Sequence, residues 1–455
     1  MKKAEPSFYN LAWRWHFYAG LFVAPFMILL ALTGIIYLFK PQLDNLMYRD
    51  FLHVQPGTQR ISADMQQHEV LMGWPGAKVS KYFPPVNAEG SAQFVLNYQG
   101  RDLNVFIDPY RGNILSVQDA KNNLQAIARG LHAELLIGTP GDRLIELAAG
   151  WGVVLVVSGL YLWWPRGRNP AGVLWPRLSR RGRVLWRDLH AVSGFWGSLL
   201  LLFMLLSGMT WTGFWGKQYA EVWNSFPAAM WTDVPQSKRL AGELNTATQQ
   251  TVPWAVENTP LPVSGGEHAE HMQHHGASSG PADPRVSLQD VVDIATRYQI
   301  EPGYSISAPK TAEGVYTVSV FADDPRNDAT LHIDQYSGKV LAQVGWEHYG
   351  LVSRATELGV MLHEGKFFGW LNQLLMLLVC LMILLGSVSA LVIWWKRRPQ
   401  GGLGVPPLRH DLPRWKTAIA VMLVLGALFP LVGISMLLMW ALDNLVVRSR
   451  MAHAN

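Results

Sequence analysis

The sequence predicts a membrane protein: an α-helical bundle, made of two duplicated helix pairs and a fifth helix, joined to two external α+β modules. Its composition, its long apolar segments and an internal repeat predict this class. Of the 455 residues, 49% are hydrophobic and only 16% are charged, whereas soluble proteins have about 25% charged residues. The 20 tryptophans agree with this class, because Trp concentrates where a bilayer meets water.

Five segments are long enough to cross a bilayer, whose hydrocarbon core of about 30 Å requires roughly 20 apolar residues. They lie at about residues 17–39, 143–164, 190–213, 370–395 and 417–440. The first follows Lys2 and Lys3, as the core of a signal sequence would. Its apolar part is too long and no small-residue cleavage site follows, so segment 1–39 is expected to be an uncleaved anchor.

The basic residues predict the orientation, because cytoplasmic loops carry an excess of Lys and Arg. Segments 165–188 and 396–416 are the Arg-rich loops and are expected in the cytoplasm, together with the N-terminus. The two long connections, 40–142 and 214–369, are then expected outside. The tail 441–455 is also expected outside, although its Arg448 and Arg450 run against the rule.

Several classes of function are excluded or disfavoured. The single cysteine, Cys380, excludes an intrachain disulfide, a Cys-rich zinc site and an iron–sulfur cluster, and without a C-x-x-C-H any haem is non-covalent. The formal net charge is +5, but the basic residues stand in short clusters beside apolar segments, so nucleic acid is not an expected partner. No Ser-His-Asp set, His-Glu-x-x-His or Walker loop is present, which disfavours hydrolysis and ATP-driven transport.

The internal repeat is the most informative feature. The first and third apolar segments share a His, a Gly and a hydroxyl-Gly pair at an offset of 174 residues: His16, Gly20, Thr33 and Gly34 match His190, Gly194, Ser207 and Gly208. The second and fourth share a His and a Gly before the segment and two Trp at its end, at an offset of 231: His132, Gly138, Trp163 and Trp164 match His363, Gly369, Trp394 and Trp395.

The external connections repeat as well. Each holds an Ile-Asp-x-Tyr-x-Gly turn, at 107–112 and at 333–338, flanked by alternating apolar residues that are typical of strands. Short helices are expected upstream, at about 62–72 and 287–299, followed by strands such as 93–98 and 315–321. We therefore expect one small α+β module in 40–142 and another at about 285–345.

These features resemble the PepSY-associated transmembrane family, whose members pair membrane helices with external PepSY domains and include inner-membrane reductases of ferric siderophores. The carrying residues are the His16 and His190 segments, the Leu-His segments at His132 and His363, and the two turns. The resemblance covers roughly residues 10–398. It implies a bacterial inner-membrane location, b-type haem held by histidines, and electron transfer across the membrane to an oxidised acceptor such as a ferric siderophore.

The histidines can also be interpreted without the family. A b-type haem in a helical bundle needs two axial donors that face each other, and neutral imidazole suits iron. His16 and His190 share a depth at the cytoplasmic side and are the expected ligands of an inner haem. Gly20 and Gly194 follow one turn later, where the lack of a side chain would leave room for a porphyrin, and Arg14 and Arg187 could face its propionates.

His132 and His363 share a depth on the outer side and are the expected ligands of a second haem. In straight helix His132 would stand roughly 15 Å outside the hydrocarbon core, so a bend is expected near Pro140-Gly141. Two alternatives stay open here. A lone histidine at a helix end is often an interfacial residue bonded to water or headgroups, and small residues in membrane helices often serve only packing.

The stretch 264–284 is a low-complexity insert whose histidines could bind a transition metal: His268, His271, His274 and His275. It could equally be a solvated linker, because nothing around it supplies a scaffold.

The prediction for function is a haem-dependent ferric reductase with two haems b, which passes electrons from the inner pair to the outer pair. The cytoplasmic loops of about 20 residues are too short for a nucleotide or flavin domain and no G-x-G-x-x-G opens a helix there. Electrons would therefore come from membrane quinol or from a separate cytoplasmic donor. Two alternatives are a non-catalytic membrane regulator that binds a protease or peptide, and a metal-binding transport accessory built around the insert.

Overall fold

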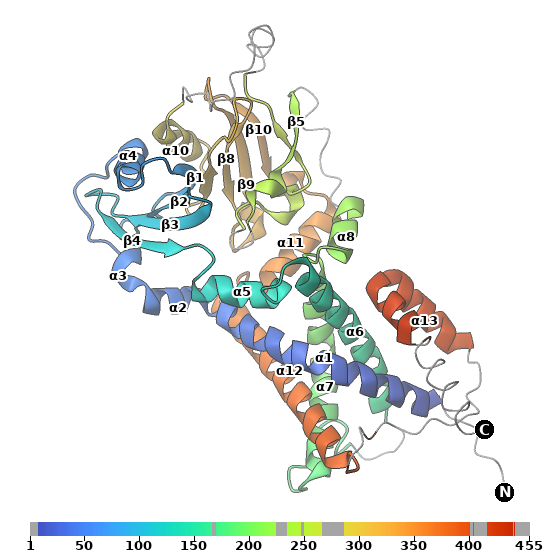
Figure 1. Cartoon of the computed structure of the whole chain (residues 1–455). Helices are drawn as coiled ribbons and strands as arrows, with labels where there is room; N and C mark the ends of the chain where they lie inside the picture. The colour runs from blue at the N-terminus through green and yellow to red at the C-terminus, as the bar shows by residue number, and fades with distance from the viewer. Residues whose placement is uncertain are drawn as a thin grey trace, which may run out of the picture. The chain divides into compact units, whose positions relative to one another are not determined.

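The computed structural model describes residues 8–165, 170–223, 234–246, 250–265, 286–400, 404, 416–439 and 441 (Figure 1). The chain divides into two compact units, and each unit is assembled from separate parts of the sequence. The first, the helical unit, comprises Met1–Ile35, Leu131–Gln218 and Leu374–Asn455. The second, the sheet unit, comprises Ile36–Gly130 and Tyr219–Gln373.

Within the described residues, four helices are long and apolar enough to cross a membrane. They are α1 (Phe8–Leu38), α6 (Thr139–Trp163), α7 (Arg183–Met209) and α12 (Trp370–Arg397). All four coincide with predicted segments, but α1 and α7 begin well before their apolar runs. The extra turns contain Trp and Arg side chains suited to the membrane interface, so His16 and His190 lie inside helices and not at their ends.

Close packing of α6 against α7 depends on small residues, as is usual between membrane helices. A Cβ added at Gly152 of α6 would lie 3.0 Å from a Cδ atom of Leu205 of α7, so the leucine packs directly on the α6 backbone. Buried apolar side chains from α1, α6 and α7 form one cluster, in which Val23, Trp151 and Met209 are almost fully buried.

The fifth predicted membrane helix, 417–440, is wrong as a single straight span. The segment forms α13 (Lys416–Leu428) and a separate short helix, Pro430–Met439. A Cβ added at Gly433 would lie 2.9 Å from the Cα of Gly426, whereas seven residues of straight helix extend about 10 Å. The chain therefore folds back at Phe429, because Pro430 lacks an N–H and suits the first position of a new helix.

This helical hairpin packs on α6 and on the residues that follow α7. The indole N–H of Trp151 donates to the hydroxyl of Ser435 at 2.9 Å, and that of Trp215 donates to the carbonyl of Leu428 at 2.8 Å. Val432 and Phe429 lie where Gly150 of α6 has no side chain. The hairpin is thus part of the core of the helical unit.

The sheet unit contains one eight-stranded antiparallel sheet with the strand order β10-β9-β8-β7-β1-β2-β3-β4. The strands are β1 (Lys78–Phe83), β2 (Ala92–Tyr98), β3 (Arg101–Ile107), β4 (Ile114–Asp119), β7 (Ser305–Ser307), β8 (Val315–Val320), β9 (Ala329–Asp334) and β10 (Val340–Gly345). Each set of four follows a helix, α4 (Ala63–Gly73) or α10 (Leu288–Arg297). The predicted helices and strands of the two modules are present, and β1 and β7 join them into a single sheet through the pair Lys81 and Ser307.

The two halves of this unit repeat in detail. Asp108 and Asp334 each accept backbone N–H groups two and three residues later, in the Ile-Asp-x-Tyr-x-Gly turns. Gly112 and Gly338 close these turns with φ of 73° and 69°, which favour glycine. Asp64 of α4 accepts from the Leu288 backbone at the start of α10 at 2.8 Å, and a side chain of α10 reciprocates at the start of α4.

The remaining elements are short. They are α2 (Lys40–Met47), α3 (Arg49–Leu52), α5 (Leu124–Glu134), α8 (Trp215–Trp223), α11 (Leu351–His363), the strands β5 (Gln236–Leu240) and β6 (Pro260–Pro262), and the 3-10 helices η2 (Ala241–Leu244), η3 (Trp254–Val256), η4 (Pro325–Asn327) and η5 (Trp346–His348).

The hairpin predicts the side of the membrane on which residue 455 lies. Four crossings followed by a hairpin that returns would put the tail 441–455 on the same side as loop 396–416, and the basic residues Arg448 and Arg450 would then follow the positive-inside rule. A fluorescent protein fused after Asn455 should therefore be active, and alkaline phosphatase fused there should not. Phosphatase activity at this position, with fluorescence lost, would show that the segment crosses the membrane.

Buried carboxyl groups predict a pH dependence of the sheet unit. Burial raises the pKa of Glu257 to about 7, and burial with a neighbouring carboxyl group raises that of Glu357 and of Asp328. Stability from these neutral groups is complete below the ordinary carboxyl pKa and is lost as the pH rises through the raised values. Thermal unfolding should show a falling Tm between about pH 5 and pH 8, and Glu357→Gln should flatten the decline. Glu313→Gln, at an exposed position, should not; an equal slope in all three proteins would contradict this account.

Candidate functional site

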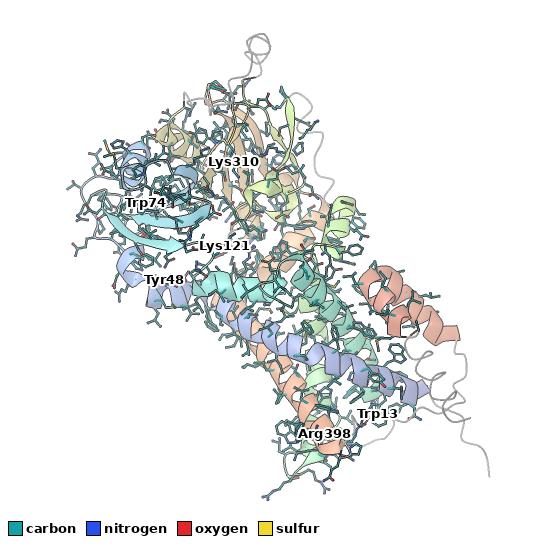
Figure 2. All side chains as sticks on the ribbon, in the orientation of Figure 1. Trp13, Tyr48, Trp74, Lys121, Lys310 and Arg398 are labelled. Atoms are coloured by element: carbon teal, nitrogen blue, oxygen red, sulfur yellow. The ribbon has the colours of Figure 1, made fainter. Side chains whose placement is uncertain are left out.

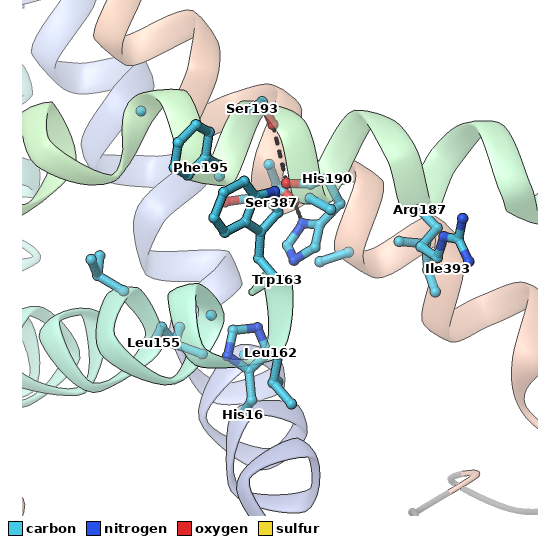
Figure 3. Close-up of a pocket in the computed structure, with 18 of the residues that line it drawn as sticks. His16, Leu155, Leu162, Trp163, Arg187, His190, Ser193, Phe195, Ser387 and Ile393 are labelled. Atoms are coloured by element: carbon cyan, nitrogen blue, oxygen red, sulfur yellow. Dashed lines mark hydrogen bonds between the residues drawn. The ribbon is translucent and has the colours of Figure 1, made fainter. Parts of the chain in front are cut away.

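A cavity of about 790 Å³ lies among α1, α6, α7 and α12 of the helical unit, and His16 and His190 both line it. Its volume is in the range of cofactor sites, about 300–1,000 Å³. The wall is mainly apolar and aromatic, with Arg side chains at the ends of α7 and α12. Figure 3 shows His16 and His190 on different helices, turned toward the same space.

The His16 and His190 rings have the separation of two ligands on one metal. Their centroids are 6.2 Å apart and their planes differ by 71°. A metal lies about 2 Å from a bound imidazole nitrogen, hence about 3 Å from the ring centre, so two axial imidazoles have centres about 6 Å apart. Two axial imidazoles can be rotated relative to each other about the axis through the metal, so planes that differ by 71° are compatible with shared ligation. The structure therefore brings the predicted inner pair together.

Hydrogen bonds fix which nitrogen of each ring carries the proton. His16 Nδ1 lies 2.9 Å from the Ser158 hydroxyl, whose own hydrogen is donated to the Val154 carbonyl at 2.6 Å. His190 Nδ1 lies 2.9 Å from the Gly386 carbonyl, which can only accept. Both Nδ1 atoms therefore donate, and the lone pair is on Nε2 of each ring. Metal-binding histidines in proteins show this arrangement, with the second N–H held by an oxygen.

Glycines leave open space around the two rings. A Cβ added at Gly194 would meet nothing within 4 Å, and one at Gly20 would meet only Leu155 at 3.9 Å. Both predicted glycines line the cavity. Gly159 of α6, which the sequence alone did not indicate, lies closer: a Cβ there would be 3.2 Å from Cε1 of His16.

Of the two predicted arginines, Arg14 and Arg187, one lines the cavity and the other does not. Arg187 lines the cavity (Figure 3), and its guanidinium pairs with the buried Asp188 at 2.9 Å. Arg14 does not belong to the lining, and its guanidinium lies over the Tyr18 ring, 5.2 Å from the centroid. The structure thus does not place Arg14 in the cavity wall, because a residue two positions before His16 lies on another face of the helix; its role toward the propionates stays a prediction from the sequence.

Arg183 and Arg397 line the cavity and were missed. Arg183 and Arg187 stand seven and three positions before His190 and hence on its face of α7, a signal present in the sequence. Arg397 ends α12 and lies over the Trp13 ring at 4.6 Å. Trp13 and Arg398, the residue after α12, are marked in Figure 2. In the sequence, the basic residues 396–398 at the end of α12 had indicated only the orientation of the helices in the membrane.

Aromatic side chains stiffen the wall beside His190. The rings of Trp163 and Phe195 stack with centroids 3.8 Å apart and planes 7° apart. The Trp163 indole donates to the Val173 carbonyl at 2.9 Å, which ties the loop after α6 to the cavity. Trp163, one of the repeated tryptophans at the end of the second apolar segment, thus shapes the site.

His132 lies at the end of α5 and is folded back onto α1, as the expected bend requires. The chain turns between α5 and α6 through Leu135, Leu136 and Gly138, which have φ of 54°, 59° and 68°. A Cβ at Gly141 would lie 1.8 Å from the Glu134 carbonyl, so glycine is needed there. His132 Nδ1 then lies 3.0 Å from the Thr33 hydroxyl of α1.

His363 ends α11 in the sheet unit. Burial lowers its pKa, and the neighbouring Glu364 opposes this. The imidazole is thus neutral near pH 7, the form that binds a metal. Glu364 pairs with Lys366 at 2.6 Å. A break follows here too, at Gly365 and Gly369 with φ of 75° and 57°. His132 and His363 belong to different units, so their pairing stays a prediction from the sequence.

The predicted metal site of the insert lies outside the described residues: His268, His271, His274 and His275. In the parts of the chain that the structure describes, no group of three or more His, Cys, Asp or Glu side chains has metal-binding geometry. His332 is buried in the sheet, with Nδ1 3.0 Å from the Thr317 hydroxyl. His348 accepts the Gly345 N–H at 3.1 Å.

Comparison with known proteins addresses the family and not the individual function. No curated protein matches the chain. The model of the PepSY-associated TM region matches residues 13–397, which include both histidines of the cavity, His132, His363 and the whole sheet. The match covers most of the sequence, and the chain belongs to the PepSY-associated transmembrane family.

Proposed function

We propose that this protein is a transmembrane electron-transfer protein that holds b-type haem and reduces an oxidised acceptor outside the membrane. The observation that carries the proposal is the His16–His190 pair, with ring centres 6.2 Å apart at one cavity. Its donor set fits haem: two imidazoles with Nε2 lone pairs, an apolar wall, glycines beside the rings and arginines near the helix ends. Bound haem would supply a one-electron ferric/ferrous couple.

The side chains of the cavity would orient the group and exclude water. His16 and His190 would ligate the iron from α1 and α7, with Ser158 and the Gly386 carbonyl holding their Nδ1–H groups. Arg183, Arg187 and Arg397 would pair with the two propionates, because guanidinium recognises carboxylate. The stacked Trp163 and Phe195 would keep the wall rigid, so that little rearrangement accompanies a change of charge on the iron.

The second haem would be held by His132 and His363, which correspond in the repeat of 231 residues. Thr33 accepts the Nδ1–H of His132, the same arrangement that Ser158 gives His16. Electrons would then pass from the inner pair to the outer pair across the hydrocarbon core. The donor is membrane quinol or a separate cytoplasmic protein, since the loops 165–188 and 396–416 are too short for a nucleotide domain.

The acceptor class is ferric iron in a siderophore or another chelate, in the context of iron uptake, with the sheet unit as its docking surface. Oxygen-rich chelators prefer the hard ferric ion, so one-electron reduction weakens the complex and releases iron. This part of the proposal rests on the family and on the direction of the electron path. Reduction of the acceptor needs no nucleotide site in this chain, because the electrons would come from quinol or a separate donor protein.

Substitution of the histidines tests the proposal. Purified protein should show a reducible b-type haem spectrum with about two haems per chain, one for each predicted axial pair. His16→Ala or His190→Ala should remove one haem, and His132→Ala or His363→Ala the other. His53→Ala, at an exposed histidine bonded to Asn45, should remove none. Reduction of ferric chelates should fall with each of the four ligand variants.

The alternatives give a different result in the same experiment. Colourless protein with full helicity, after expression with added haem, would reject the electron-transfer proposal and favour a non-catalytic regulator or a metal-binding accessory. Loss of no haem in any of the four variants would reject the ligand assignment alone.

Arginine substitutions test the placement of the propionates. Arg183→Ala and Arg397→Ala should each weaken haem retention about 10- to 100-fold, because a hydrogen bond to a charged group contributes about 1.5–3 kcal/mol. Arg14→Ala is the matched control, since Arg14 is outside the lining. Haem loss measured by transfer to apomyoglobin would distinguish them; equal rates in all three variants would contradict the placement.

A further inference from the structure

His16 and His132 are each held by a pair of the same kind, a hydroxyl residue followed by glycine. Ser158-Gly159 of α6 contacts His16 of α1, and Thr33-Gly34 of α1 contacts His132 before α6. Each of the two helical segments thus gives a histidine to one end of the membrane and a hydroxyl-glycine pair to the other. In both sites, the histidine of one segment is therefore held by the hydroxyl-glycine pair of the other.

The hydroxyl of each pair can only accept from the histidine. Thr33 donates its hydrogen to the Leu29 carbonyl at 2.7 Å, as Ser158 does to Val154 at 2.6 Å. Both hydroxyls are therefore committed to their own helix, one turn earlier. His132 Nδ1, like His16 Nδ1, must carry the proton, which leaves the lone pair on Nε2.

Of the two glycines, Gly159 is the one needed to make room for its ring. A Cβ at Gly159 would lie 3.2 Å from Cε1 of His16, and a Cβ at Gly34 would lie 3.6 Å from Cε1 of His132. The first distance is tighter than ordinary contact and the second is ordinary contact. A side chain at 159 would therefore displace its histidine, whereas alanine at 34 would fit.

The repeat has alanine in place of this glycine at the matching position. Ser389-Ala390 of α12 corresponds to Ser158-Gly159 at the offset of 231. There His190 does not bond the serine. Its Nδ1 donates to the Gly386 carbonyl at 2.9 Å, and Ser389 donates to the same carbonyl at 3.0 Å. Where alanine replaces glycine, the histidine Nδ1–H is thus accepted by a backbone carbonyl and not by the serine hydroxyl.

We propose that Ser158 and Gly159 beside His16, and Thr33 beside His132, are positioning residues: the hydroxyls fix the Nδ1–H tautomer of each histidine and set the electron donation of each imidazole to iron. This inference rests on the proposed function. His16 donates to a hydroxyl and His190 to a carbonyl, so the two ligands of the inner pair have different acceptors for their Nδ1–H groups. Outer hydrogen bonds of this kind tune both the affinity and the potential of a metal site.

The test replaces the hydroxyls in the full-length protein and measures haem affinity, the midpoint potential of each haem and the low-spin ferric electron paramagnetic resonance signal. Ser158→Ala should affect the inner haem alone and Thr33→Val the outer haem alone. Each should lower haem affinity about 10- to 100-fold and raise the midpoint potential, because weaker donation stabilises the ferric form less. Ser158→Thr and Thr33→Ser should restore both quantities.

Two further comparisons distinguish loss of the hydrogen bond to histidine from a general change in the packing of the cavity wall. Ser193→Ala is the matched control, since Ser193 lines the same cavity and bonds only backbone carbonyls of its own helix. It should leave the spectra unchanged. Gly159→Ala should change the inner resonance signal, whereas Gly34→Ala should leave the outer signal as it is.

The outcomes separate the two proposals. Absence of haem from the unaltered protein would overturn the proposed function. Haem bound in Ser158→Ala and Thr33→Val with unchanged potentials and spectra would overturn the positioning role and leave the proposed function standing. If either hydroxyl variant does not fold, an unchanged signal in Gly159→Ala would still overturn the inference.

Discussion

An imidazole inside a membrane helix bundle must have its N–H group satisfied, because no water is available in the hydrocarbon region. In this protein that constraint also determines the chemistry. The N–H of His16 is held by Ser158 and that of His190 by the Gly386 carbonyl. The second nitrogen of each ring is then the basic one, at a shared cavity. The tautomer and the orientation of each ring follow from these two bonds, and helix packing brings the rings to a separation of 6.2 Å.

The same bonds show how a bundle can hold polar groups at low cost. Ser158 and Thr33 first satisfy their hydroxyl hydrogens within their own helices, and only then accept from a histidine of another segment. The hydroxyl hydrogens of Ser158 and Thr33 therefore need no partner outside their own helices. The arginines, in contrast, stand at helix ends, where long side chains reach the interface. The cavity is therefore apolar in its middle and cationic at one end, which would suit the two propionates of the proposed haem.

Much of this arrangement could be predicted from sequence and some of it could not. Helix lengths depend on local hydropathy, and the repeat equates the depths of His16 and His190, so both were predictable. Ser158 was not, because its contact depends on how α6 is rotated toward α1. Arg14 was assigned by nearness in sequence, although two residues along a helix point away from each other. The fifth helix failed because hydropathy counts apolar residues and does not detect that Gly426 and Gly433 allow the chain to reverse.

An experimental density map of the full-length protein, purified without added ligands and determined by electron cryomicroscopy, tests the central claim most directly. The account predicts a planar, porphyrin-sized density between His16 and His190, with the metal bound to both Nε2 atoms. Continuous helices around a cavity filled by lipid or side chains, with the two rings apart, would contradict it.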